Sequence, residues 1–529
     1  MITQTADVLV VGSGFGGAIP AYYLAAGGAR VTVLERGPRL AAADFAQSLR
    51  IGTYNKIVDV IQGDGTTVVA GNCVGGGSVI YFAASLRAPD FIFERRGSLN
   101  RRLWPSALTR AALDPWYDRV EEALPVTRAN WSDVSYAGGV LAAACRRAGH
   151  TCNPVPVAVD TGVCTNCNWM LSGCRFDAKR SLLLNYLPAA EAHGAEIRPL
   201  HEVQTIGRSP LSGYRYAITY TVLDPDDFTC TAQAGVLHAR TVVLAAGALG
   251  TPVILQRSAP LLGGIPRAVG RYFTGNGDRV SVADIDETKA RTLLGLSRAD
   301  SIAYQGLPIG RPITAATFDY LNDTAPEYSR FTIQQIYFPP LTNLLAQTPG
   351  GSWFGTEKRS MRARWRSWLT LLTMSEDDNE GILGAPPLTG SFTRLAPGLG
   401  QSSLSYHPTA RTTAAWNKAD TALRDILQKD GLSRVMPWAE DVAGTVTAHP
   451  LGTARLGDDP ATSALTGTHE LRGYPGLFIT DGSAVPTSLT VNPSLTIAAL
   501  AERAVPFITD HARSTGVPVQ PGAPIPTGP

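Results

Sequence analysis

The chain has 529 residues, with 46 Lys and Arg against 44 Asp and Glu, so its formal net charge is only +2. This balance gives no support for nucleic acid as a partner. Hydrophobic residues make up 44% and charged residues 17%, which provides a large core and excludes a mostly disordered chain. We find no apolar run long enough for a transmembrane helix and no signal-peptide pattern, so we expect a cytoplasmic protein.

The first part of the chain follows a strand–helix–strand pattern. Residues 7–11 form a short apolar run, residues 18–26 are rich in Ala and Leu, and residues 30–34 are rich in β-branched side chains. Such runs predict a buried strand, a helix and a second strand. Apolar runs that end at a glycine predict further strands at 241–247 and 477–482. The alternation is typical of an α/β fold.

Four other segments depart from this simple pattern. Residues 66–81 place Val-Gly-Gly-Gly-Ser between two β-rich pieces, and residues 177–187 look helical. Residues 280–440 contain more Thr, Tyr, Trp and Pro, which indicates a second domain. From Arg513 onward the chain is rich in Pro and Gly, so we expect a tail that is disordered or laid over the surface.

The turn after the first strand fits the pattern G-x-G-x-x-G. The first glycine permits a tight turn, the second lets the backbone approach a pyrophosphate, and the third lets the helix pack on the strand. Glu35 ends the second strand, where a carboxylate can accept hydrogen bonds from a ribose diol. The pattern predicts a dinucleotide site, against the alternative of a tight turn without ligand, and does not choose between NAD and FAD. The residues of this turn are Gly12, Gly14, Phe15, Gly16 and Gly17.

Four separated parts of the sequence then point to one family. They are Val-Val-Gly-Ser-Gly-Phe-Gly-Gly-Ala (10–18), Val-Gly-Gly-Gly-Ser (74–78), Ala-His-Pro-Leu-Gly-Thr-Ala-Arg-Leu-Gly (448–457), and Asp-Gly-Ser-Ala-Val-Pro (481–486) with Val-Asn-Pro-Ser-Leu-Thr-Ile-Ala-Ala-Leu-Ala-Glu-Arg-Ala (491–504). The chain resembles the glucose–methanol–choline (GMC) flavin oxidoreductases, and among them the bacterial cholesterol oxidase branch.

This resemblance implies a Rossmann-like FAD-binding domain, interleaved in sequence with a substrate-binding domain built on a β-sheet covered by helices. We expect the discontinuous FAD-binding domain to comprise residues 1–90, 160–279 and 441–512. The substrate-binding domain and connecting segments would comprise residues 91–159 and 280–440, and residues 513–529 would form the tail.

The resemblance also implies contacts with FAD in several parts of the chain. The segment of Gly75, Gly76, Gly77 and Ser78 would pass along the flavin and the pyrophosphate. Val203 would contact adenine, Ala246 and Gly247 would flank the ADP part, and Asp481 with Gly482 would lie near the ribityl chain or the pyrophosphate. The helix that starts near Pro493 would point its N-terminus at the flavin. Some members attach FAD through a His before the triple glycine. Since this chain has no His before His150, we expect non-covalent FAD.

His449 and Asn492, each followed by Pro, match the active-site pair of the family. Oxidation of an alcohol requires removal of the hydroxyl proton while a hydride leaves carbon for the flavin N5. A His near neutral pH can take that proton, and an Asn can orient the hydroxyl with its donor and acceptor. We therefore expect an FAD-dependent alcohol oxidase or dehydrogenase, with oxygen or another electron acceptor.

Fewer sequence features bear on the substrate and on the alternative functions. Cholesterol oxidases add a Glu that isomerises the steroid, but residues 331–345 contain no Asp or Glu. Tyr81 and Phe82 also replace the Asn and Gly of those enzymes. We expect a bulky or apolar alcohol, sterol-like or a secondary metabolite. A flavin-containing lyase and a non-catalytic lipid-binding protein are the alternatives.

Three further features allow either a functional or a purely structural interpretation. Cys164, Cys167 and Cys174, with Cys152, could hold a metal, but free thiols or one local disulfide are favoured, so we expect no metal. A basic aromatic helix at 353–368 could touch a membrane, but a solvated face with its Trp residues anchored in the substrate domain is favoured. The acidic run at 376–381 is expected to be a solvated turn between strands rather than a cation site.

Overall fold

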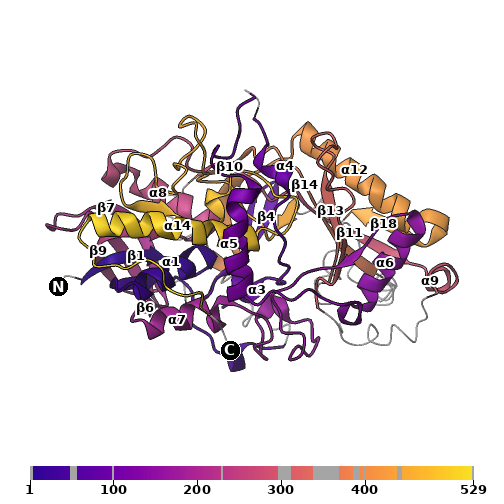
Figure 1. The fold of residues 1–529 in the computed structure, drawn as a ribbon, viewed down its shortest axis with the longest axis horizontal. Helices are drawn as coiled ribbons and strands as arrows, with labels where there is room; N and C mark the ends of the chain where they lie inside the picture. Colours follow the sequence, from indigo (N-terminus) through magenta and orange to yellow (C-terminus); the bar gives the residue numbers. More distant parts are fainter. Residues whose placement is uncertain are drawn as a thin grey trace.

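The computed structural model describes residues 4–47, 56–97, 100–227, 230–295, 311–337, 368–384, 394–396, 399–437 and 444–526. Figure 1 shows an elongated molecule with two halves. The half at the left contains both ends of the helix α14 (Ser494–Ser514) and the helix α1 (Phe15–Ala26). The half at the right contains α6 (Tyr136–Ala148), α9 (Glu287–Leu294) and α12 (Ala410–Leu427). The described residues contain no helix that is both long and apolar enough to cross a membrane.

The first sheet forms the centre of the left half. Its strand order is β6-β2-β1-β9-β8-β7, with β20 also paired to β9. Strand β1 pairs in parallel with β2 and β9, and its Val8, Leu9 and Val10 are fully buried, as expected for a parallel strand covered on both faces. The strands are β1 (Gln4–Val11), β2 (Val31–Leu34), β6 (Glu196–Arg198), β7 (His201–Arg208), β8 (Tyr216–Leu223), β9 (Thr231–Leu244) and β20 (Leu477–Ile479).

Helices pack against this sheet and against one another. Helix α1 contacts α14 and α7 (Tyr186–Ala192), and α14 also contacts α5 (Arg110–Ala123). Helix α8 (Gly247–Leu262) follows β9 and contacts β7. Every residue of α1 from Phe15 to Ala25 is buried, so its sequence carries no polar face.

A second sheet joins segments from distant parts of the chain. Its strand order is β10-β15-β17-β3-β4-β19, with β16 paired to β17. Strand β4 leads into the triple glycine, and β19 leads into His449, so this sheet supports two parts of the candidate site. The strands are β3 (Val58–Asp64), β4 (Thr66–Gly71), β10 (Arg271–Phe273), β15 (Gly381–Gly384), β16 (Arg394–Ala396), β17 (Leu399–Ser405) and β19 (Thr445–Thr447).

The third sheet forms the centre of the right half, in the order β18-β11-β14-β13-β12-β5. One face packs against α6 and α12 through residues such as Ile333 and Leu371. The opposite face turns Val280, Ile336 and Leu372 toward the core of the first half. The strands are β5 (Asn153–Pro154), β11 (Asp278–Ile285), β12 (Ala315–Thr317), β13 (Phe331–Ile336), β14 (Trp368–Ser375) and β18 (Ser433–Pro437).

The α/β fold class is confirmed, and two local predictions are wrong. The triple glycine is followed by the short helix α3 (Gly77–Ile80) and not by a strand, because Gly75 and Gly76 have positive φ and turn the chain. The helix expected at 177–187 is a 3-10 turn at Leu182–Leu184 followed by α7. Remaining short helices are α4 (Asp90–Phe93) and the 3-10 turns Ala42–Asp44, Trp131–Asp133, Met170–Ser172, Lys429–Gly431 and Gly482–Ala484.

The tail beyond Arg513 is laid over the surface where the structure describes it. Helix α14 continues to Ser514, and the chain then returns along α1. Val517 and Val519 are buried, and the Gln520 N–H donates to the Gly27 carbonyl at 2.8 Å. Burial of alternate apolar residues holds this Pro- and Gly-rich segment in place.

Candidate active site

The two glycine-rich turns face each other across a narrow space. A Cβ on Gly12 would lie 2.3 Å from the Ala245 carbonyl oxygen, and one on Gly17 would lie 1.9 Å from the Gly12 carbonyl oxygen. The absence of a side chain at these two glycines therefore allows the backbone segments to pack closely. In contrast, a Cβ on Gly14 or Gly77 would meet nothing within 4 Å, while one on Gly76 would lie 3.0 Å from the Gly14 Cα.

The start of α1 opens into the same space. Gly14 caps the helix without any side-chain hydrogen bond, so the N–H groups of Phe15 and Gly16 in its first turn have no acceptor within the helix. Unpaired N–H groups and the positive end of the helix dipole favour a bound phosphate. The cradle of Gly14, Gly76 and Gly77 therefore fits the pyrophosphate of a dinucleotide.

Glu35 links these turns to each other. Its Oε2 accepts from the Ser13 N–H at 2.9 Å and the Ser13 hydroxyl at 2.7 Å, and its Oε1 accepts from the Gly37 N–H at 2.9 Å. The Ser13 oxygen accepts in turn from the Gly75 N–H at 2.9 Å. A carboxylate has about four acceptor positions, so Glu35, which already accepts three hydrogen bonds, keeps one for a ribose hydroxyl. Val203 lies nearby, because β7 begins where the His201 N–H donates to the Glu35 carbonyl at 2.8 Å.

Asp481 holds the start of α8 against α1. Its carboxylate accepts from the Gly247 N–H at 2.8 Å, the Thr251 hydroxyl at 2.5 Å and the Ser483 N–H at 2.9 Å. Burial raises the pKa of Asp481, against the opposing effect of these hydrogen bonds. A Cβ on Gly16 would lie 2.7 Å from the Asp481 nitrogen. The side chain is thus engaged within the protein, and only the backbone of Asp481 reaches the glycine turn.

The remaining expected cofactor residues lie around the same turns. Ala246 is the N-terminal cap residue of α8, and Pro493 is that of α14. The Gly482 carbonyl accepts from the Gly452 N–H at 3.1 Å, which joins it to the loop after His449. The Ser78 hydroxyl donates to the Gly75 carbonyl at 2.7 Å.

His449 and Asn492 lie together, and a third residue joins them. The His449 Nδ1 is 2.9 Å from Asp278 Oδ1, and its Nε2 is 3.5 Å from Asn492 Nδ2. The other oxygen of Asp278 accepts from the Thr447 hydroxyl at 2.8 Å. The side chains of His449 and Asp278 are only 15% and 3% exposed. Asp278 was not predicted, since it belongs to no motif and lies at the start of β11.

The contact with Asp278 decides which nitrogen of His449 can act as a base. A carboxylate only accepts hydrogen bonds, so Nδ1 of His449 carries a proton and donates it to the Asp278 carboxylate. Nε2 then carries a lone pair, which faces the Asn492 amide nitrogen at 3.5 Å. This arrangement suits removal of a proton from a substrate hydroxyl.

Asn492 is held by residues of the third sheet. Its Oδ1 accepts from Gln334 Nε2 at 2.9 Å. In the preceding segment, Asn276 accepts from the Leu489 N–H at 2.6 Å and donates to the Val491 carbonyl at 2.9 Å. None of these partners was predicted. Gln334 lies in the described part of the segment where an isomerising Glu was sought, and residues 331–337 contain no carboxylate.

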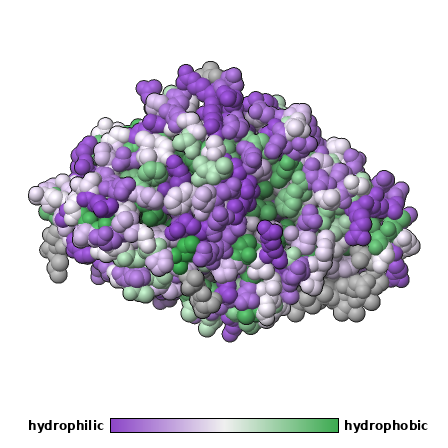
Figure 2. Space-filling model, viewed as in Figure 1, coloured by the Kyte–Doolittle hydropathy of each residue, from purple (hydrophilic) through white to green (hydrophobic). Residues whose placement is uncertain are grey.

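An apolar wall borders the pair on the side of the third sheet. Leu372 of β14 pairs with Gln334 of β13 and with Val280 of β11, so the three side chains share one face. Ile336 lies two residues beyond Gln334 on the same face. In Figure 2, apolar side chains gather in the hollow between α5 and α12.

Lys179 fixes the segment that follows the triple glycine. Its Nζ donates to the carbonyls of Val79, Met170 (2.7 Å) and Tyr81 (3.3 Å). Burial lowers the pKa of Lys179 to about 7. The Tyr81 hydroxyl donates to the Arg180 carbonyl at 2.7 Å, and its ring meets Phe15 edge-on at 5.7 Å. Tyr81 therefore belongs to a rigid wall beside the glycine turns.

Comparison with known proteins identifies the family. Two models described as GMC oxidoreductase match residues 6–274 and 402–501. The chain belongs to the GMC oxidoreductases. It is 28% identical to a cholesterol oxidase of Mycobacterium tuberculosis, over 98% of this chain and 94% of that protein. It is 25% identical to a cholesterol oxidase of Acinetobacter baumannii, over 95% and 94% of the two chains.

The solved structures agree with this assignment. An FAD-dependent oxidoreductase from Chaetomium thermophilum has a TM-score of 0.66 at 16% identity, covering 96% of this chain and 100% of that one. Members of the GMC family are FAD flavoproteins. The predicted class of enzyme, an FAD-dependent alcohol oxidase or dehydrogenase acting on CH–OH groups, is confirmed.

The cysteines of this GMC oxidoreductase do not form one group of four. Cys164, Cys167 and Cys174 line a common small cavity. Cys152 lies instead beside Cys145 of α6, in the core between that helix and the third sheet. Cys152 therefore does not join the other three thiols in this structure.

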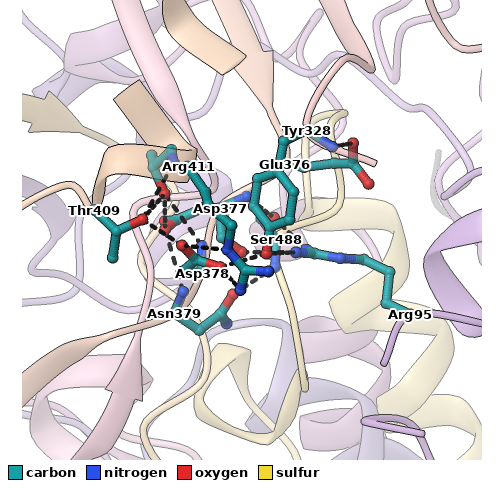
Figure 3. A network of polar contacts seen from close by, with 10 residues as sticks. Arg95, Tyr328, Glu376, Asp377, Asp378, Asn379, Thr409, Arg411 and Ser488 are labelled. Atoms are coloured by element: carbon teal, nitrogen blue, oxygen red, sulfur yellow. Dashed lines mark hydrogen bonds and ion pairs between the residues drawn. The ribbon is translucent and has the colours of Figure 1, made fainter. Parts of the chain in front are cut away.

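The acidic run at 376–381 is a turn between β14 and β15, as predicted, but most of it is buried, and Glu380 is its exposed member. Glu376 and Asp377 are 0% and 1% exposed. Asp377 accepts from the hydroxyls of Thr274 and Tyr406, and burial raises its pKa. Figure 3 shows how Arg95 enters this network.

Arg95 comes from a distant part of the chain. It donates to the Asp377 carbonyl at 2.8 Å and to the Ser488 hydroxyl at 2.9 Å, and Arg411 pairs with Asp378 at 2.6 Å. These cations make burial of the run possible, and no local pattern could reveal them. The network anchors Ser488, four residues before Asn492.

The basic aromatic segment at 353–368 lies outside the described residues except for its last member. Trp368 begins the strand β14, so at this residue the predicted helix is wrong. Its side chain is buried, at 4% exposure, as expected for a Trp anchored in the substrate domain.

Proposed function

We propose that this chain oxidises the CH–OH group of a bulky, largely apolar alcohol, with His449 and Asn492 acting on the hydroxyl beside non-covalently bound FAD. The arrangement of Asp278, His449 and Asn492 carries this proposal. It provides one acceptor and one donor to a single oxygen, in a site with little solvent exposure. Bound FAD would supply the acceptor for the hydride that leaves the carbinol carbon.

The residues of the chain would act on the proton and the oxygen. Asp278 keeps the proton on Nδ1 of His449, so Nε2 takes the hydroxyl proton. The N–H of Asn492 hydrogen-bonds the oxygen while negative charge develops on it. Since the pair is mostly buried, both contacts are stronger than in water.

Several residues would hold the cofactor. The cradle of Gly14, Gly76 and Gly77, with the first turn of α1, would bind the pyrophosphate, and Glu35 the ribose. The start of α14, after Pro493, would place a positive helix end beside the flavin, which favours the reduced anion. No His precedes His150, which supports non-covalent binding.

The wall of the site supports the class of substrate. Val280, Leu372 and Ile336 present apolar surface next to Gln334 and the pair. A sterol-like or similarly bulky substrate would bury apolar area against this surface. Burial of apolar area favours binding by about 25 cal/mol per Å². We propose oxidation without isomerisation, because residues 331–345 provide no carboxylate.

Anaerobic mixing with a panel of alcohols, sterols included, tests the proposal. We expect one class of bulky alcohols to bleach the flavin, and admission of air then tells whether oxygen is the acceptor. His449→Gln should bind FAD normally and lower the rate of bleaching at least about 100-fold, the usual effect of losing a general base. Flavin-loaded protein that no alcohol bleaches would contradict the proposal, as would an unchanged rate in the variant.

A further inference from the structure

Gln334 contacts Asn492 from the centre of the third sheet. It lies on β13, its side chain is fully buried, and its Nε2 donates to Asn492 Oδ1 at 2.9 Å. Its own Oε1 has no hydrogen-bond partner within the described part of the chain. A buried amide that leaves its acceptor unpaired costs free energy. Among the residues that the structure describes, the side chain of Gln334 makes one hydrogen bond, the contact with Asn492.

The backbone around Asn492 is fixed by other groups. Asn276 bonds both Leu489 and Val491, and the Thr332 hydroxyl donates to the Thr490 carbonyl at 2.8 Å. These contacts place the Cα of Asn492 but leave its terminal amide free to turn by half a rotation. Gln334 holds the oxygen end of this amide, while the nitrogen end faces His449.

The direction of the amide matters for the reaction. With Oδ1 engaged by Gln334, the Nδ2 of Asn492 faces His449 Nε2 at 3.5 Å. A substrate hydroxyl placed beside both nitrogens can donate to His449 and accept from Asn492. With the amide reversed, the Asn492 carbonyl would face an oxygen that gains negative charge, and the two would repel each other.

We propose that Gln334 is a positioning residue that holds the Asn492 amide with its N–H toward the reacting oxygen. The inference rests on the proposed function of the pair as an alcohol site. Asp278 and Gln334, from two strands of the same sheet, would then fix the acceptor and the donor of that site respectively.

Gln334→Leu removes the contact and replaces the amide with an apolar side chain of similar volume. We expect the limiting rate of anaerobic flavin reduction to fall about 10- to 100-fold, as for loss of a hydrogen bond to a charged group. FAD content should not change. Gln335→Leu is the matched control, because Gln335 is equally buried but faces Thr314, whose hydroxyl donates to it at 2.7 Å.

A double-mutant comparison separates positioning from a general loss of stability. In an Asn492→Leu background, Gln334→Leu should have no further effect on the rate, since no amide remains to orient. Equal effects of Gln334→Leu with and without Asn492 would overturn the proposal. So would a control variant with Gln335→Leu that loses as much rate.

A second readout does not depend on turnover. In protein with ¹⁵N-labelled histidine, the Nε2 signal of His449, identified by its absence in His449→Gln, reports the N–H that points at it. We expect this signal to shift in Gln334→Leu and to stay in place in Gln335→Leu. If no alcohol reduces the wild-type flavin, the proposed function fails. The NMR comparison still decides the role of Gln334, and an unchanged signal rejects it.

Discussion

Replacement of Asp278 by Asn tests the polarity of the candidate site most directly. The variant keeps the shape of the side chain but loses the charge that faces His449 Nδ1 at 2.8 Å. An amide can also turn its NH₂ toward Nδ1, which would place the histidine proton on Nε2. The nitrogen that should accept the hydroxyl proton would then be blocked.

The size of the effect follows from the geometry. Loss of a hydrogen bond to a buried charge costs about 1.5–3 kcal/mol, which is about 10- to 100-fold in rate. Where a similar exchange imposes the wrong tautomer on a catalytic histidine, the loss reaches about 10⁴-fold. With Asp278 only 3% exposed, water cannot readily replace it, so we expect a fall of about 10²- to 10⁴-fold.

The assay is the limiting rate of flavin reduction under anaerobic conditions at saturating alcohol. Asp284→Asn, further along the same strand β11, is the matched control and should retain the rate within about twofold, the usual range for a substitution away from the site. FAD content and the melting temperature report whether each variant is folded. A folded, flavin-loaded Asp278→Asn variant with the wild-type rate would refute the role assigned to Asp278.

Two further predictions concern the cradle and the buried lysine. Gly14→Ala should fold normally but bind FAD weakly, whereas Gly17→Ala should lower the melting temperature, because its Cβ would lie 1.9 Å from the Gly12 carbonyl oxygen; equal melting temperatures would contradict this. Since burial lowers the pKa of Lys179 to about 7, the unfolded chain holds more protons than the folded one between pH 7 and 10. The free energy of unfolding should therefore gain about 1.4 kcal/mol per pH unit over that range. Urea titrations should show this gain in the wild type relative to Lys179→Met, and parallel curves would exclude it.

Local sequence was sufficient where a function depends on neighbouring residues. Gly12, Gly14 and Gly17 form a turn whose geometry is set within a few residues, and Glu35 ends the next strand. His449 and Asn492 could be proposed because each lies in a distinctive run of residues. The α/β fold class followed from the alternation of apolar runs with helical segments.

Tertiary structure decided the partners of these residues. Asp278 and Gln334 lie on strands of the third sheet, in stretches whose pattern indicates only buried β structure, and the sequence does not tell which strand faces which loop. The sequence predicted that the acidic run at 376–381 is solvated. Arg95, whose positive charge makes burial of the run possible, is far away in the chain. The sequence determined the types of group that the site contains. Packing of the third sheet against the His449 and Asn492 segments determined which groups meet and in which direction their protons point, since hydrogen bonds between residues distant in sequence form only once both segments are folded.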